Sequence, residues 1–341
     1  MQKIYLKIAK TSLVLVYIVI IAGAVVRMTG SGMGCPDWPK CFGYYIPPTN
    51  IETLQWQPDR AFKKGQVIII KEELFTANSD FLTGPIINME NWQRYEKHDY
   101  AVFNVWHTWI EYINRLVTVI LGIPMVLLLI LSFLLYKKNK LLTIATVITI
   151  IVLGVQAVLG KIVVDTNLKA GMITVHMFFA FLLLALLLIL IYQAKEQKTT
   201  RTLDPFTRNL IILTAAITLT QVIMGTQVRE FIDRQVDQLG YESKDLWLTN
   251  APIKFYLHRS FSIIIVILNL YLFTRIHKKV QDYAKPKWAL ALIVLSVATG
   301  IAMYYFDFPF SSQPLHLVLA ALLFGVQFYM VLETKNSNKT S

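Results

Sequence analysis

The sequence predicts an all-α integral membrane protein with eight transmembrane helices, arranged as two four-helix bundles related by a pseudo-twofold axis. Two observations predict the class. Apolar residues make up 55% of the 341 residues and charged residues only 16%, whereas soluble domains average about 25% charged residues. The chain also contains eight separate apolar stretches of about 20 residues, the length that crosses a bilayer.

The distribution of charge excludes a nucleic-acid-binding protein. The net charge is +12 at pH 7, but the lysine and arginine residues cluster between the apolar stretches, as they do in cytoplasmic loops. The expected surroundings are therefore membrane lipid, and no nucleic-acid partner is expected. With only two cysteines, the chain is not a small disulfide-stabilised protein.

Each apolar stretch predicts one membrane span. The first follows three lysines and has features of a signal peptide, but the polar motif after it is continuous with the apolar run, so we expect a retained span. The predicted spans are residues 11–27, 107–136, 141–160, 171–193, 209–226, 255–276, 287–305 and 313–332.

The basic clusters predict the orientation. They lie in the N-terminal segment and in the connections between spans two and three, four and five, and six and seven. With eight spans these segments share one side, so both termini are expected in the cytoplasm and the spans in the inner (plasma) membrane. A long loop at about 28–106 and a shorter one at about 229–253 then face outward. Cys35 and Cys41 lie in the long loop, where an oxidising environment favours a disulfide; two free thiols are the alternative.

The two halves of the chain repeat the same motifs in the same order. The first pair is separated by 202 residues and the others by 140 to 144, because the first half has the longer outer loop. Four spans in each half give both halves the same orientation. We therefore predict an N-terminal half at 1–195, which includes the long loop, and a C-terminal half at 205–341. The repeated pairs are Gly23 to Arg27 with Gly225 to Arg229, Asn114-Arg115 with His258-Arg259, Gly160 with Gly300, and His176 with His316.

Histidines inside two spans of the second half predict a haem site. His258 and His316 are expected at one depth on two helices of one bundle, an arrangement that suits two axial ligands of haem iron. Zinc would need three or four ligands, and no further ligand accompanies the pair. The alternative is that they are hydrogen-bonded packing residues. Arg259 and Arg229 could bind the propionates of such a haem, or extend to the membrane interface.

The first half predicts a more open site. His176 stands at the position of His316 and is a candidate ligand for a second haem iron, with Arg115 and Arg27 as candidate propionate partners. Asn114 replaces the first histidine, and an amide is a poor iron ligand. Glu111 lies one turn before Asn114 and could stabilise a developing cation or take up a proton. The alternative is a structural i,i+4 ion pair between Glu111 and Arg115.

These residues resemble the haem A synthase family. The resemblance rests on residues 23–32 (GAVVRMTGSG) and 35–41 (CPDWPKC). It continues through Glu111, Arg115, His176, His258-Arg259 and His316, and thus covers nearly the whole chain.

The resemblance implies an eight-helix enzyme. Its C-terminal half would hold haem b between His258 and His316. Its N-terminal half would receive haem O and oxidise the C8 methyl group, through an alcohol, to the formyl group of haem A, with water as the oxygen source. The resemblance further implies that Glu111 assists this step, that Cys35 and Cys41 are paired, and that a haem O synthase supplies the substrate.

The chain departs from the family pattern in three ways. Asn114 stands where the family usually has histidine, the second cysteine pair of some relatives is absent between 229 and 253, and residues 45–105 form an insertion that caps the substrate site or binds a partner. A di-haem electron-transfer cytochrome and a haem O carrier are the alternative functions. The electron acceptor, the oligomeric state (a homo-oligomer included) and the final oxidation level of the product stay open.

Overall fold

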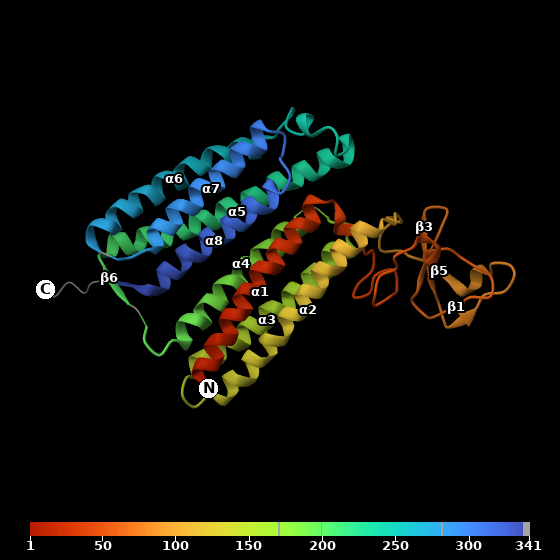
Figure 1. Ribbon diagram of the computed structural model, residues 1–341, viewed down its shortest axis with the longest axis horizontal. Coiled ribbons are helices and arrows are strands. Elements are labelled where there is room, and N and C mark those ends of the chain that lie inside the picture. The colour runs from red at the N-terminus through yellow and green to blue at the C-terminus, as the bar shows by residue number, and fades with distance from the viewer. Residues whose placement is uncertain (170, 199, 281, 337–341) are drawn as a thin grey trace. The chain divides into compact units, whose positions relative to one another are not determined.

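The computed structural model describes residues 1–169, 171–198, 200–280 and 282–336 (Figure 1). Within these residues, eight helices are long and apolar enough to cross a membrane. Each predicted span falls on one of them, so the prediction of an all-α multi-pass membrane protein is confirmed. The helices are α1 (Gln2–Met28), α2 (Val105–Leu134), α3 (Lys140–Asp165), α4 (Met172–Ala194), α5 (Pro205–Leu239), α6 (Ile253–Lys279), α7 (Lys285–Tyr305) and α8 (Ser312–Glu333).

Helix α5 is longer than its predicted span. It continues from residue 226 to Leu239, through a polar segment that was predicted as part of an outer loop. Two i,i+4 ion pairs support this extension: Arg229 with Asp233 at 2.7 Å, and Glu230 with Arg234 at 2.8 Å. The helix ends at Leu239 and is followed by Gly240, whose φ of 80° is accessible to glycine. The connection to α6 is therefore shorter than predicted.

The chain divides into two compact units. The first comprises residues 1–21, 120–156 and 174–341, and the second comprises 22–119 and 157–173. This division cuts across the first four helices, whereas the predicted division separates the two halves of the sequence. The arrangement as two pseudo-twofold-related bundles therefore stays a prediction.

Within the first unit, α5, α6, α7 and α8 form a closed ring. Each helix packs against the next along the chain, and α8 packs against α5 (Figure 1). Ile265, Ala289, Ile293 and Leu323 form a buried core cluster of this ring. Apolar residues such as Ile267 on α6 remain exposed, as expected for helix faces that contact lipid.

The segments of α1 to α4 that belong to the first unit contribute to another apolar core. Met125, Leu128, Leu184 and Leu187 are fully buried in it. At its edge, the Tyr5 hydroxyl and Thr146 Oγ1 form a hydrogen bond of 2.7 Å.

The long loop contains a small β-structure, which the sequence pattern did not predict. Strand β2 (Val67–Ile70) pairs antiparallel with β3 (Glu73–Ala77), which pairs with β5 (Trp92–Arg94). A second pair joins β1 (Ala61–Phe62) to β4 (Phe81–Leu82). Phe62, Phe81 and Trp92 pack together with ring centroids 4.9 to 6.0 Å apart. Most of the insertion at residues 45–105 is thus a folded element with its own aromatic core. A short parallel pair, β6 (Arg201–Leu203) with β7 (Thr334–Asn336), lies in the first unit.

Candidate functional site

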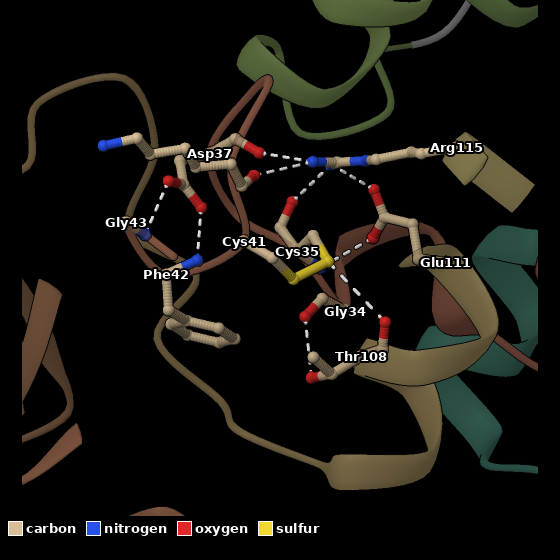
Figure 2. The surroundings of a disulfide bond; sticks show 10 residues. Gly34, Cys35, Asp37, Cys41, Phe42, Gly43, Thr108, Glu111 and Arg115 are labelled. Carbon is tan, nitrogen blue, oxygen red and sulfur yellow. Dashed lines mark hydrogen bonds and ion pairs between the residues drawn. A yellow bond between two sulfur atoms is a disulfide. The ribbon is translucent and has the colours of Figure 1, made fainter. Parts of the chain in front are cut away.

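Cys35 and Cys41 form a disulfide, with Cα atoms 4.6 Å apart (Figure 2). The disulfide closes a tight segment, residues 34–43, which we call the disulfide loop. The loop lies directly on the first turns of α2: Thr108 Oγ1 donates a hydrogen bond to Gly34 O at 2.8 Å. A Cβ at Gly34 would lie 2.3 Å from the carbonyl oxygen of His107, so only glycine permits this approach.

Arg115 of α2 binds the backbone of the disulfide loop. Its Nη1 donates to Asp37 O at 2.7 Å and to Lys40 O at 2.8 Å, and its Nη2 donates to Cys35 O at 2.8 Å. Nη2 also forms an ion pair with Glu111, one turn earlier on the helix. The planar guanidinium thus bonds three loop carbonyls and one carboxylate (Figure 2).

Glu111 is buried at the contact between α2 and the disulfide loop, with 3% of its surface exposed. One carboxylate oxygen pairs with Arg115, and the other accepts a hydrogen bond from Cys35 N at 2.7 Å. The i,i+4 ion pair that the sequence offered as the structural interpretation is therefore present. A buried carboxylate needs such partners, and here they also fix its position.

Asp37 organises the far side of the disulfide loop. Its carboxylate accepts hydrogen bonds from Phe42 N and, at 2.8 Å, from Gly43 N. Burial raises the pKa of Asp37 above its ordinary value, while the bond from Gly43 and the nearby Arg115 act in the opposite direction. The loop is therefore closed by a disulfide, an arginine and an internally bonded aspartate.

Asn114 lies next to this network on α2. A Cβ at Gly23 of α1 would lie 3.9 Å from Asn114 Oδ1. That oxygen is buried and has no hydrogen-bond partner among the described residues. The side chain therefore offers an unused acceptor at the position where the second half of the repeat has a histidine.

The second group of candidate residues is the histidine pair of the ring formed by α5 to α8. The rings of His258 and His316 have centroids 6.3 Å apart and are inclined at 69°. Each ring lies against a glycine of a neighbouring helix. A Cβ at Gly225 of α5 would lie 3.0 Å from His258 Cε1, and one at Gly300 of α7 would lie 3.6 Å from His316 Cε1. The two glycines thus leave space for the imidazole rings.

Thr299 of α7 holds the ring of His316. Its Oγ1 donates to Ser296 O at 2.8 Å and lies 2.9 Å from His316 Nδ1. When Thr299 donates to Ser296 O, His316 Nδ1 carries the ring proton and Nε2 has the lone pair. A hydrogen bond on one ring nitrogen of this kind orients the other nitrogen of a metal-ligating histidine.

The pair fits a haem iron by distance and by ligand number. Two imidazoles that bind one ion from opposite sides have ring centroids about 6 Å apart, since each metal–nitrogen bond is about 2 Å long. His258 Nδ1 is buried and, like Asn114 Oδ1, lacks a hydrogen-bond partner in the described part of the chain. Two axial ligands are the number that a bis-histidine haem iron takes, and the described residues contain no group of three or more His, Cys, Asp or Glu that could hold a metal ion.

The arginines of the second half have different surroundings. Arg229 bonds Gln313 Oε1 and pairs with Asp233. Arg259 is exposed, and its guanidinium lies 5.3 to 5.9 Å from the ring centroids of Phe255, Tyr256 and Tyr304. An exposed guanidinium with cation–π contacts can still donate hydrogen bonds to a propionate carboxylate.

The remaining candidates of the first half are Arg27 and His176. Arg27 lies in the last turn of α1, in the second unit. His176 of α4 lies in the first unit, with Nε2 3.4 Å from Gln156 Nε2. Its Nδ1 is buried, and no described residue bonds it.

One contact between neighbouring helices occurs at equivalent positions of the two halves. Gly23 faces Asn114 in the first half, as Gly225 faces His258 in the second. Sequence reasoning noted both glycines as parts of repeated motifs but assigned them no role. It also missed Thr299, because a single threonine in an apolar helix does not indicate a contact with a histidine.

Together, the helices and these sites define a class: a multi-pass membrane protein with a disulfide-closed loop on one helix end and a histidine pair inside a four-helix ring. Comparison with known proteins identifies the family. The chain matches the cytochrome oxidase assembly protein family (COX15-CtaA) over residues 7–73 and 85–328, and it belongs to that family. It is also similar to a protein named heme A synthase from Shewanella oneidensis, with 42% identity over 45 residues. That similarity covers 13% of this chain and 14% of the relative.

Proposed function

We propose that the chain is a haem A synthase that oxidises the C8 methyl group of haem O to a formyl group through an alcohol. The observation that carries the proposal is the difference between the two halves. The second half has a complete histidine pair, whereas the first half has Asn114 and the buried, oriented carboxylate of Glu111. Membership of the cytochrome oxidase assembly family and the similarity to a heme A synthase support it.

The proposed reaction balances with water as the oxygen source. Addition of water to the methyl carbon with loss of two electrons and two protons gives the alcohol. Loss of two further electrons and two protons gives the aldehyde. The electrons leave to an acceptor that the chain's residues do not identify, and the protons need a base.

We assign the base or cation-stabilising role to Glu111, because a carboxylate can stabilise positive charge on the reacting carbon or take up a proton from water. Arg115 binds both Glu111 and the disulfide loop, so we assign it to holding this carboxylate. His176 is the proposed ligand of the substrate haem iron, and Arg27 a proposed partner of a substrate propionate.

In the second half, His258 and His316 are the proposed ligands of haem b, which when bound supplies one-electron redox chemistry. Thr299 orients His316, and Gly225 and Gly300 leave room for the two rings. Arg259 and Arg229 are the proposed propionate partners. We further propose that both termini are cytoplasmic, in the inner membrane, and that a haem O synthase supplies the substrate.

Two other functions share this fold. A di-haem electron-transfer cytochrome would need two well-ligated haems, and Asn114 argues against it. A haem O carrier would bind haem O and release it unchanged, so the identity of the haem product separates it from the enzyme.

The substitution Glu111→Gln tests the proposed role of the carboxylate. It keeps the shape of the side chain and removes its charge. We expect the haem A yield to fall by about 100-fold or more, the range of general acid–base catalysis, while haem b content stays as in the wild type. Mass analysis of extracted haems gives the yield, and the absorbance spectrum gives haem b. A wild-type haem A yield would exclude this role.

A further inference from the structure

Several buried polar side chains lie on the inside of the ring formed by α5 to α8, away from the histidine pair. Thr218, Ser296 and Gln327 are at most 6% exposed. Thr218 Oγ1, Ser296 Oγ and Gln327 Oε1 are buried and have no hydrogen-bond partner in the described residues, and the same holds for Gln221 Oε1. Inside a membrane protein, a buried polar atom without a hydrogen bond destabilises the fold, so each such atom is expected to be bonded.

These residues follow one column along the ring. From Gly225 of α5, Gln221 and Thr218 lie four and seven residues earlier, on the same helix face. Asn269 lies eleven residues after His258, and Gln327 eleven residues after His316. They therefore lie at the same level, and Gln327 Nε2 donates to Asn269 Oδ1 at 3.0 Å. At 1.5 Å per residue, the column extends about 16 Å from the histidine pair.

Direct contacts join the upper end of the column to both histidines. Gln221 Nε2 donates to His258 O at 2.8 Å, which leaves its Oε1 unbonded. On the other side, Thr299 joins His316 to the backbone of Ser296. The unbonded atoms of Gln221 and Ser296 thus lie one turn below the histidine level.

Helix packing alone does not explain the column. An interhelical amide bond such as that between Asn269 and Gln327 holds membrane helices together, and a buried threonine usually bonds a carbonyl of its own helix, as Thr214 Oγ1 does with Leu210 O. The hydroxyls of Thr218 and Ser296 make no such bond, and Gln327 Oε1 is left over.

The first half of the repeat provides an internal comparison. At the offsets of the repeat, Thr218 corresponds to Val16, Gln221 to Val19, Asn269 to Met125 and Gln327 to Leu187. Met125 and Leu187 are fully buried and Val16 is 3% exposed, so the burial is alike and only the polarity differs. Ser296 alone has a polar counterpart, Gln156, which contacts His176.

We propose that the C-terminal ring holds a chain of internal water molecules, which bonds these four unpartnered atoms and reaches from the histidine pair to the Asn269–Gln327 pair. Buried waters typically bond about three otherwise unsatisfied polar groups. Such a chain conducts protons and keeps the neighbourhood of the histidines polar, whereas the first half has apolar side chains at four of the five corresponding positions. The proposal rests on the protein's own polar atoms and does not depend on the proposed function.

Hydroxyl-radical labelling by X-ray irradiation tests the proposal, because radicals formed from internal water oxidise adjacent side chains. Met330 and Met125 are both fully buried, and Met330 lies one turn from Gln327. In the purified wild-type protein we expect Met330 to be oxidised several-fold faster than Met125. Equal rates would overturn the proposal.

Replacing the polar pair with the residues of the first half should remove the water. In the variant Asn269→Met with Gln327→Leu, we expect the rate for Met330 to fall to that of Met125. The exposed α6 substitution Leu270→Met is the matched control and should leave the Met330 rate unchanged. If the double variant does not fold, Thr218→Val should lower the Met330 rate. An unchanged rate in the folded double variant, or in Thr218→Val, would contradict a water chain.

Discussion

At the scale of single residues, the two halves use equivalent positions for different purposes. Arg115 and Arg259 occupy the same place in the repeat, but Arg115 binds loop carbonyls and Glu111 whereas Arg259 is exposed among aromatic rings. The residue one turn earlier decides this difference, since it is Glu111 in one half and Phe255 in the other. The carboxylate of Glu111 pairs with the guanidinium of Arg115, which also bonds the carbonyls of the disulfide loop; we call this set of contacts the clamp.

Gly225 is predicted to be required for the histidine pair. A methyl group there would lie 3.0 Å from His258 Cε1, so the ring must shift. We expect Gly225→Ala to lower haem b content several-fold, as measured by the absorbance spectrum of the purified protein. Alanine usually stabilises a helix interior relative to glycine by about 0.5–1 kcal/mol, so helix propensity does not predict a loss.

Gly23 supplies the matched control for this substitution. It occupies the same repeat position in the first half, where a Cβ would make ordinary contact at 3.9 Å with Asn114 Oδ1. Gly23→Ala should leave haem b content unchanged. Equal effects of the two substitutions would show that the close approach to His258 is not the cause.

At the scale of elements, the disulfide loop and the start of α2 form one unit. Cys35, Cys41 and Phe42 of the loop belong to a small core against which Tyr112 of α2 packs. Backbone groups of the loop are also bonded to α2: Gly34 O, Cys35 N and the three carbonyls bound by Arg115. Removing Arg115 should therefore detach the loop even when the disulfide is intact.

The variant Arg115→Met tests this attachment. It leaves the buried carboxylate of Glu111 without its cation, a change that typically costs 3–5 kcal/mol. We expect a lower melting temperature in detergent and faster protease cleavage within residues 29–104. Arg259→Met, at the equivalent position of the second half, is the control and should change neither property strongly. If both variants behave like the wild type, the clamp does not hold the loop.

A second element contact joins the start of α5 to the end of α6. Asp204 caps α5 by accepting from Thr207 N at 3.1 Å, and it also binds Arg275 at 3.1 Å and Lys279. The bonds from Lys279 and Thr207 hold the pKa of Asp204 well below its ordinary value. Its ionised form is therefore the one that stabilises the folded protein.

The pH dependence of Asp204→Asn follows from the sign of this shift. The stabilisation by Asp204 is fully present above the unfolded pKa of about 4 and decreases as the pH falls toward the lower folded pKa. For a partly exposed pair we expect a difference from the wild type of at most about 1 kcal/mol. Melting curves should show that difference at pH 7 and pH 5, and a smaller one at pH 3. A difference that grows on acidification would contradict the assignment.

At the scale of the whole molecule, the hydrophobic pattern predicted the eight helices, because a span needs only length and apolarity. It did not predict the extension of α5, because residues 229–234 are rich in charged side chains and so resemble a loop in composition. Nor did it predict the strands of the long loop, which are only two to five residues long. The network around Arg115 was beyond sequence reasoning because its acceptors are backbone carbonyls, which have no sequence signature.

The positions of His258 and His316 near the ends of their spans predicted that the two histidines lie at one depth, and their rings are 6.3 Å apart. The sequence did not predict the polar column below the pair. A buried amide or hydroxyl indicates such a column only when the structure shows that it lacks a hydrogen-bond partner. The difference between the halves therefore extends from Glu111 and Asn114, and their counterparts Phe255 and His258, into the helix cores.

The most direct test of the proposed haem A synthase activity is the identity of the haems that the protein carries. The protein would be purified from cells that also make haem O, and the non-covalent haems extracted in acid acetone and identified by mass. We predict haem b together with haem A. Haem b with unchanged haem O would contradict the enzyme and indicate a carrier, and haem b alone would indicate an electron-transfer cytochrome.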